Sequence, residues 1–111
     1  MVSKKILFFI SLALVSVSFN VYAIDTSICS SEANIELHQN GSLKSCQLKD
    51  NYEANNITCN NLGYVSFYDD GKLESCVLSK SATVGENKCK EYGLISFYID
   101  GKLKSCMKSD D

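Results

Sequence analysis

The sequence has no proline, no arginine and a single histidine, and no two of its six cysteines are near neighbours in the sequence. Without proline, no strand loses a backbone donor in its interior. Residues 24–111 carry 9 lysines against 13 acids, a charge of −4. Nucleic acid and anionic membrane surfaces require basic patches, so neither is expected as a partner. No segment shows apolar spacing of three and four residues over three turns, so little or no helix is expected beyond the N-terminal leader.

The first 23 residues have the features of a signal peptide. Lys4 and Lys5 precede an apolar stretch from Ile6 to Val17, and Val21-Tyr22-Ala23 forms a cleavage site of the A-x-A type. This segment would be helical if retained. An uncleaved anchor is the alternative, but the apolar run is shorter than the ~20 residues of a comfortable span. Ile28 lies where a lipoprotein has a small residue before its first cysteine, which argues against a lipid anchor.

Cleavage would leave residues 24–111, an exported chain with no membrane span. All six cysteines lie in this part. An even, regularly spaced set of cysteines in a short exported chain is typical of a disulfide framework, because such a chain buries little apolar surface. The expected location is the periplasm or the outside of the cell.

A 30-residue period organises the mature chain. Residues 63–76 recur with few changes at 93–106, and a more divergent copy lies at 35–46. The cysteines follow the same offset, as Cys29, Cys59, Cys89 and as Cys46, Cys76, Cys106. Self-similarity at a fixed period is the signature of a repeat architecture. The prediction is one domain of three units, at about 24–53, 54–83 and 84–111.

Each copy has the pattern of a β-hairpin. Residues 35–38 alternate apolar and polar side chains, as in a strand with one buried face. The pairs Asn40-Gly41, Asp70-Gly71 and Asp100-Gly101 favour a type I′ turn, whose two central residues need positive φ. The linkers at 49–58 and 79–88 are polar, and each has room for one short strand, near 53–57 and 81–84.

The register of the hairpins has two solutions. A two-residue turn at Asp70-Gly71 places Val65 opposite Cys76 and Phe67 opposite Glu74, and leaves Leu73 on the face away from these apolar residues. A bulge beside the glycine would shift the register by one. In either case a single hairpin is marginal in water, so the three must share a core. The expected fold is all-β, with three hairpins stacked into one curved sheet or a short solenoid.

Six cysteines allow fifteen pairings, which the 30-residue period narrows to two. Pairing within units joins Cys29–Cys46, Cys59–Cys76 and Cys89–Cys106 and uses all six. Pairing between units joins Cys46–Cys59 and Cys76–Cys89 and leaves the outer two unpaired. The first is favoured, as a set of structural disulfides. Catalytic dithiols and zinc sites have much shorter spacings, so no metal or cofactor is expected.

Few side chains suggest a reaction. His38 is the only histidine, yet Tyr68 and Tyr98 occupy its position in the other copies, which favours a half-exposed strand position over catalysis. Asp69, Asp70 and Asp100 lie at turns and are too few per turn for calcium. The three ring side chains, His38, Tyr68 and Tyr98, could form a ladder that binds an extended peptide or a sugar. They are the candidate binding face.

The core Ile-Ser-Phe-Tyr-x-Asp-Gly-Lys-Leu-Lys-Ser at 95–105, varied at 65–75, resembles the variant MORN-type repeat. The resemblance covers the hairpin of each unit; the longer period and the cysteines depart from it. It implies an all-β scaffold for interactions, without a common catalytic residue. The leading hypothesis is a small exported, non-enzymatic binding or structural module, whose partner would be a protein, peptide or glycan. The alternatives are a small secreted enzyme or toxin whose site forms only on folding, and an inhibitor or immunity-type partner.

Overall fold

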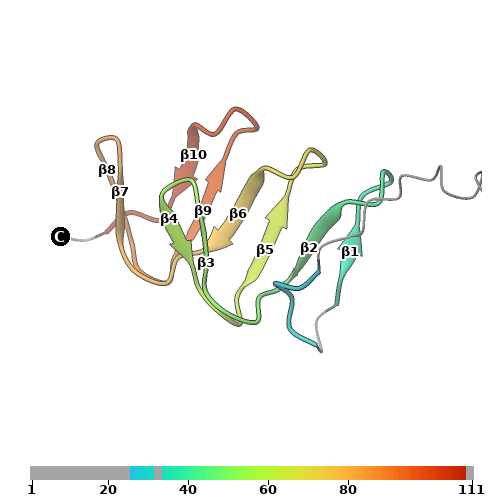
Figure 1. Ribbon diagram of the computed structural model, residues 1–111. Coiled ribbons are helices and arrows are strands. Elements are labelled where there is room, and N and C mark those ends of the chain that lie inside the picture. The colour runs from blue at the N-terminus through green and yellow to red at the C-terminus, as the bar shows by residue number, and fades with distance from the viewer. Residues whose placement is uncertain (1–25, 32–33, 110–111) are drawn as a thin grey trace, which may run out of the picture.

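The computed structural model describes residues 26–31 and 34–109, and these form an all-β structure of antiparallel strands without helix (Figure 1). The all-β prediction is therefore confirmed. The predicted signal peptide, residues 1–23, lies outside the described residues. Within the described part, no helix has the length and apolarity to cross a membrane.

Three long hairpins lie side by side in one open sheet of six strands, in the order β1-β2-β5-β6-β9-β10. Each strand is short, and adjacent hairpins pair over only three residues: Ser45–Gln47 of β2 lie opposite Tyr64–Ser66 of β5, and Ser75–Val77 of β6 lie opposite Leu94–Ser96 of β9. These two pairings are offset by 30 residues. The strands are β1 (Glu36–Leu37), β2 (Leu43–Gln47), β5 (Tyr64–Phe67), β6 (Leu73–Val77), β9 (Leu94–Phe97) and β10 (Leu103–Cys106).

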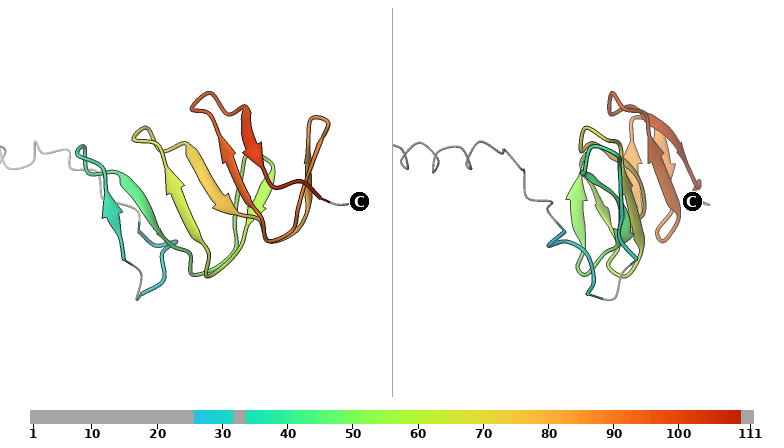
Figure 2. Two further views of the ribbon diagram at one scale, coloured as in Figure 1. Left: turned by 180° about the vertical axis from the view of Figure 1, so that it is seen from behind. Right: turned by 90° about the vertical axis from the view of Figure 1, so that its right-hand side faces the viewer.

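The linkers form two further hairpins, where the sequence led us to expect one short strand each. β3 (Tyr52–Ala54) pairs with β4 (Ile57–Cys59), and β7 (Ala82–Val84) pairs with β8 (Asn87–Cys89). These short hairpins stand apart from the six-stranded sheet (Figure 2). The predicted unit boundaries, after residues 53 and 83, therefore fall inside the short hairpins.

The type I′ turn was predicted for the wrong hairpins. In the long hairpin β5–β6, the Gly71 amide donates to the Tyr68 carbonyl, and only Gly71 has positive φ, at 91°. This is the pattern of a type I turn followed by a glycine bulge. The type I′ pattern occurs in the short hairpin β3–β4, where Asn55 and Asn56 have φ of 50° and 65°. Asparagine tolerates this left-handed conformation better than most residues.

The register of the long hairpins contains a bulge. Val65 pairs with Cys76 as expected, but Phe67 pairs with Leu73 and not with Glu74, which is the extra residue. Lys44 and Lys104 are the extra residues of the other two long hairpins. The bulge returns Leu73 to the apolar face, where it is buried with Phe67.

The core lies between the six-stranded sheet and the short hairpins. Three disulfides close this core, each across 17 positions: Cys59–Cys76 and Cys89–Cys106 join the short hairpins to the sheet, and Cys29–Cys46 joins the segment before β1 to β2. This is the pairing within units that the period favoured. Tyr52 of β3 packs edge-on against Phe67 of β5, with ring centroids 5.8 Å apart. The buried set is apolar throughout: Cys29, Cys46, Leu48, Ile57, Cys59, Val65, Phe67, Leu73, Cys76, Leu78, Cys89, Ile95 and Phe97.

Candidate binding face

The predicted ladder of His38, Tyr68 and Tyr98 links adjacent long hairpins. His38 Nε2 lies 2.8 Å from the Phe67 carbonyl oxygen, and the Tyr68 hydroxyl donates to the Phe97 carbonyl oxygen at 2.6 Å. Both side chains are half-buried. Their polar tips are therefore used to hold the hairpins together and are not free to bind a ligand.

Tyr98 is the member of this ladder with an exposed ring. Among the described residues its hydroxyl has no hydrogen-bond acceptor, and β10 is the edge strand of the described sheet. The Lys104 ammonium lies 5.8 Å from the centre of its ring, within the range of a cation–π contact. The structure thus separates the three predicted binding residues into two links and one free end.

The turn carboxylates act within their own turns. Asp70 Oδ1 accepts from the Lys72 amide at 3.0 Å, and Asp100 Oδ1 accepts from the Lys102 amide at 2.9 Å. Asn40 Oδ1 holds the Ser42 amide in the same way, at 2.9 Å. These are Asx-turn bonds, which stabilise the turn itself. Within residues 26–31 and 34–109, no three His, Cys, Asp or Glu side chains gather as a metal site requires.

The uncovered face of the six-stranded sheet carries a row of serines. Successive side chains of a strand point to opposite faces. Because Val65, Cys76 and Ile95 face the core, their neighbours face outward. The outward positions in the middle of the sheet are in register across five strands and all hold serine: Ser45, Ser66, Ser75, Ser96 and Ser105. We call this set the serine row; its Ser66 and Ser75 hydroxyls are 2.7 Å apart.

A second row, of apolar side chains, runs beside the serine row on the same face. Tyr64 lies opposite Gln47 on the neighbouring strand, and Leu94 lies opposite Val77. The Met107 amide donates to the Leu94 carbonyl. Tyr64, Leu94 and Met107 are each about half exposed. We call Tyr64, Val77, Leu94 and Met107, together with Leu62 and Tyr92 of the loops that enter β5 and β9, the apolar row.

Leu62 and Tyr92 combine exposure with backbone strain. Their side chains are 64% and 65% exposed, and their φ angles are 65° and 63°. Left-handed backbone is costly for a bulky L-residue, and glycine or asparagine would serve these loops better. Strained backbone persists where the surrounding structure enforces it, and it clusters at functional sites. Here two large apolar side chains are held in water at an unfavourable conformation.

Two glycines fix the backbone under the apolar row. A Cβ at Gly93 would lie 2.9 Å from Met107 Cβ, and one at Gly63 would lie 3.3 Å from Val77 Cβ. The loops that carry Tyr92 and Leu62 therefore approach the sheet as closely as a hydrogen at these positions allows. The Gln47 side-chain amide also donates to the Leu62 carbonyl at 2.8 Å. These contacts hold the backbone that carries Leu62 and Tyr92 close to the sheet.

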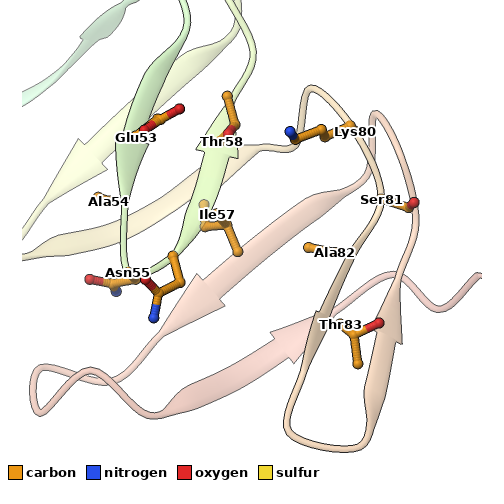
Figure 3. Close-up of a pocket in the computed structure, with 10 residues that line it drawn as sticks. Glu53, Ala54, Asn55, Ile57, Thr58, Lys80, Ser81, Ala82 and Thr83 are labelled. Carbon is orange, nitrogen blue, oxygen red and sulfur yellow. The ribbon is translucent and has the colours of Figure 1, made fainter.

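The short hairpins border a hollow between β3–β4 and the start of β7 (Figure 3). It is lined by Ile57 and by small or polar side chains, with Glu53 as its one carboxylate and Lys80 as its one ammonium. A single acid does not supply the paired groups of acid–base catalysis. His38, which a catalytic arrangement would need, bonds a backbone carbonyl elsewhere.

Sequence reasoning missed both rows. The serines and the apolar residues are visible in the 30-residue period, at 66 and 96, at 64 and 94, and at 62 and 92. What the period does not show is which face the short hairpins cover. No family model matches this chain, and neither the curated proteins nor the solved structures provide a match.

Proposed function

We propose that the protein is a small exported, non-enzymatic module of three 30-residue units, and that it binds another protein or peptide through the apolar row. The observation that carries the proposal is the pair Leu62 and Tyr92, exposed apolar side chains on strained backbone beside Tyr64, Leu94 and Met107. Monomeric proteins rarely expose large contiguous apolar patches unless a partner covers them.

Export is part of this proposal. Three disulfides within one small chain form and persist in oxidising compartments, which supports the periplasm or the cell exterior. The N-terminal leader and the resemblance of the hairpin core to variant MORN-type repeats support the same role, an exported scaffold for interactions. Mass spectrometry of the exported protein tests it: a chain beginning at Ile24, lighter by six hydrogens than the reduced form, is expected. Free thiols or a retained leader would contradict export as a disulfide-bonded domain.

The chemistry of the row favours a protein partner over a sugar. Leucine and methionine offer no hydrogen bonds to hydroxyl groups, while they and tyrosine are well suited to bury apolar side chains of a peptide. The serine row beside it offers hydroxyl groups that can bond the polar side of such a segment. A glycan is the competing ligand, and it would use the tyrosines and serines without needing Leu62.

Selection from a phage-displayed peptide library, with a glycan array in parallel, tests the partner class. Peptides with apolar or aromatic residues are expected, and their affinity should fall about tenfold or more in L62N and Y92N, as for truncated interface anchors. I99N is the matched control, since Ile99 is an exposed apolar residue at a hairpin turn and outside the row. Peptides that bind all variants equally, or glycan binding insensitive to L62N, would contradict the proposed surface.

A further inference from the structure

The two edge strands of the six-stranded sheet, β1 and β10, correspond to the two sides of a contact between neighbouring hairpins. Within the chain that contact occurs twice, where β2 receives β5 and where β6 receives β9. Beyond the strands, the Leu48 amide donates to the Gly63 carbonyl at 2.8 Å, and the Leu78 amide donates to the Gly93 carbonyl at 2.9 Å. The same atoms, 30 residues apart, therefore join each long hairpin to the next.

Strand β10 presents the donor half of this contact without a partner. It holds Ser105, Cys106 and the following Met107 where β6 holds Ser75, Cys76 and Val77. Tyr98 stands where Tyr68 donates to the Phe97 carbonyl, and the Lys108 amide stands where the Leu78 amide donates. Neither Tyr98 nor the Lys108 amide meets an acceptor among the described residues.

Strand β1, at the other end of the sheet (Figure 1), presents the acceptor half. Ile35 and Leu37 occupy the positions of Val65 and Phe67, which are buried in the core beneath the sheet. Ile35, just before β1, and Leu37 are instead 43% and 44% exposed. The described residues leave this edge of β1 unpaired, with two apolar side chains in water.

We propose that a second copy of this chain docks its β1 against β10, so that the sheet continues from one molecule into the next. The internal register then places Ile35 of the second copy opposite Cys106 and Glu36 opposite Ser105. The Leu37 carbonyl receives the Tyr98 hydroxyl, as the Phe97 carbonyl receives that of Tyr68. The contact is heterologous, so it builds open chains of molecules and not closed dimers.

Charge supports a second copy as the occupant. The β10 side of the contact carries Lys102, Lys104 and Lys108, all exposed, whereas β1 carries Glu36 at its centre. An edge rich in lysine repels other copies of itself and accepts an acidic strand. Ile35 and Leu37 also have the spacing of the buried pairs Val65/Phe67 and Ile95/Phe97, which lie at the first strand of each internal contact.

Lys108 makes this contact weaker than the internal ones. It stands where Leu48 and Leu78 are fully buried, and its ammonium donates to Asn87 Oδ1 at 2.8 Å. Its methylene stem can cover apolar surface while the charge stays in solvent. Association is therefore expected to be reversible and concentration-dependent.

Sedimentation velocity of the exported protein, with its N-terminus determined by mass spectrometry, tests the proposal. The mean mass should rise from micromolar to millimolar concentration, and Y98F should raise the dissociation constant about two- to tenfold, the effect of one hydrogen bond. Y68F is the matched control, which should lower stability and leave association unchanged. A wild-type protein that stays monomeric, or Y98F that associates like wild type, would overturn the proposal.

Charge reversal identifies the two edges. E36K and K104E should each associate less than wild type, because each places like charges across the contact, and an equimolar mixture should associate again. A mixture that stays monomeric would overturn the β1–β10 pairing. L62N and Y92N should associate like wild type; if they do not, the apolar row joins the copies and end-to-end docking is wrong. Peptide binding by the apolar row is measured separately, so each proposal can fail alone.

Discussion

At the scale of the residue, backbone conformation and side-chain chemistry disagree at Leu62 and Tyr92. Each is a bulky residue in a left-handed loop that asparagine or glycine would occupy at lower cost. Neither gains burial in return, since both side chains are mostly exposed. A bulky residue that raises the energy of the folded backbone and packs against nothing in the core is explained by a role in binding.

L62N and Y92N should therefore stabilise the fold while they weaken peptide binding. Relief of left-handed strain is expected to raise the free energy of unfolding by about 0.5–1 kcal/mol per site. Urea denaturation at equal disulfide content measures this change. A loss of stability in both variants would mean that these side chains pack in the folded state and are not reserved for a partner.

G93A tests the close approach of the loop to the sheet. The added methyl would lie 2.9 Å from Met107 Cβ, which cannot rotate away, so the variant should lose about 1–3 kcal/mol of unfolding free energy. G63A is the milder counterpart, because its nearest side-chain atom is 3.3 Å away. Equal stability of both variants and wild type would show that the loops can move off the sheet.

At the scale of the element, each long hairpin depends on the layer behind it. The strands of each long hairpin pair over only two or three residues, and a hairpin of that length is marginal alone. The disulfide and the short hairpin supply the rest of the core, as the contact between Tyr52 and Phe67 shows. The bulge at Glu74 belongs to the same arrangement, because it turns Leu73 toward that layer.

Removal of single disulfides separates chain entropy from packing. The bridges Cys59–Cys76 and Cys89–Cys106 span the same 17 positions, so each should contribute about 3 kcal/mol through the unfolded chain. Cys59 and Cys76 are both fully buried, whereas Cys106 is partly exposed. The double alanine variant at 59 and 76 should therefore be the less stable of the two in urea denaturation. The reverse order would contradict this view of the packing.

At the scale of the whole molecule, the fold is a thin, two-layer structure. It depends on covalent links for what a larger core would otherwise provide. Among the described residues only thirteen side chains are buried, and five of these are cysteines.

Reduction of all three disulfides should therefore unfold the protein. Circular dichroism in the presence of a thiol reductant is expected to lose its β signal, and removal of the reductant under oxidising conditions should restore it. Retention of the β signal after complete thiol release, verified by mass, would show that the apolar core alone is sufficient.

The local features of this protein could be read from its sequence. Alternating side chains, Asx-Gly turns and a constant offset predict the long hairpins and favour the observed cysteine pairs, because strand pattern and turn chemistry act over a few residues. The short hairpins were read as single strands, since their polar faces give a weak alternating pattern.

Only the tertiary structure decided which face of the sheet is covered and what the other face presents. The glycine bulges place Leu73 in the core, and the pairing of strands from different hairpins aligns five serines and, beside them, the apolar row. The same pairing joins neighbouring hairpins through hydrogen bonds of His38 and Tyr68, and among the described residues it leaves the Tyr98 hydroxyl without an acceptor. Register and layering depend on contacts between residues far apart in the chain, and a one-residue shift exchanges the two faces, so no local pattern contains them.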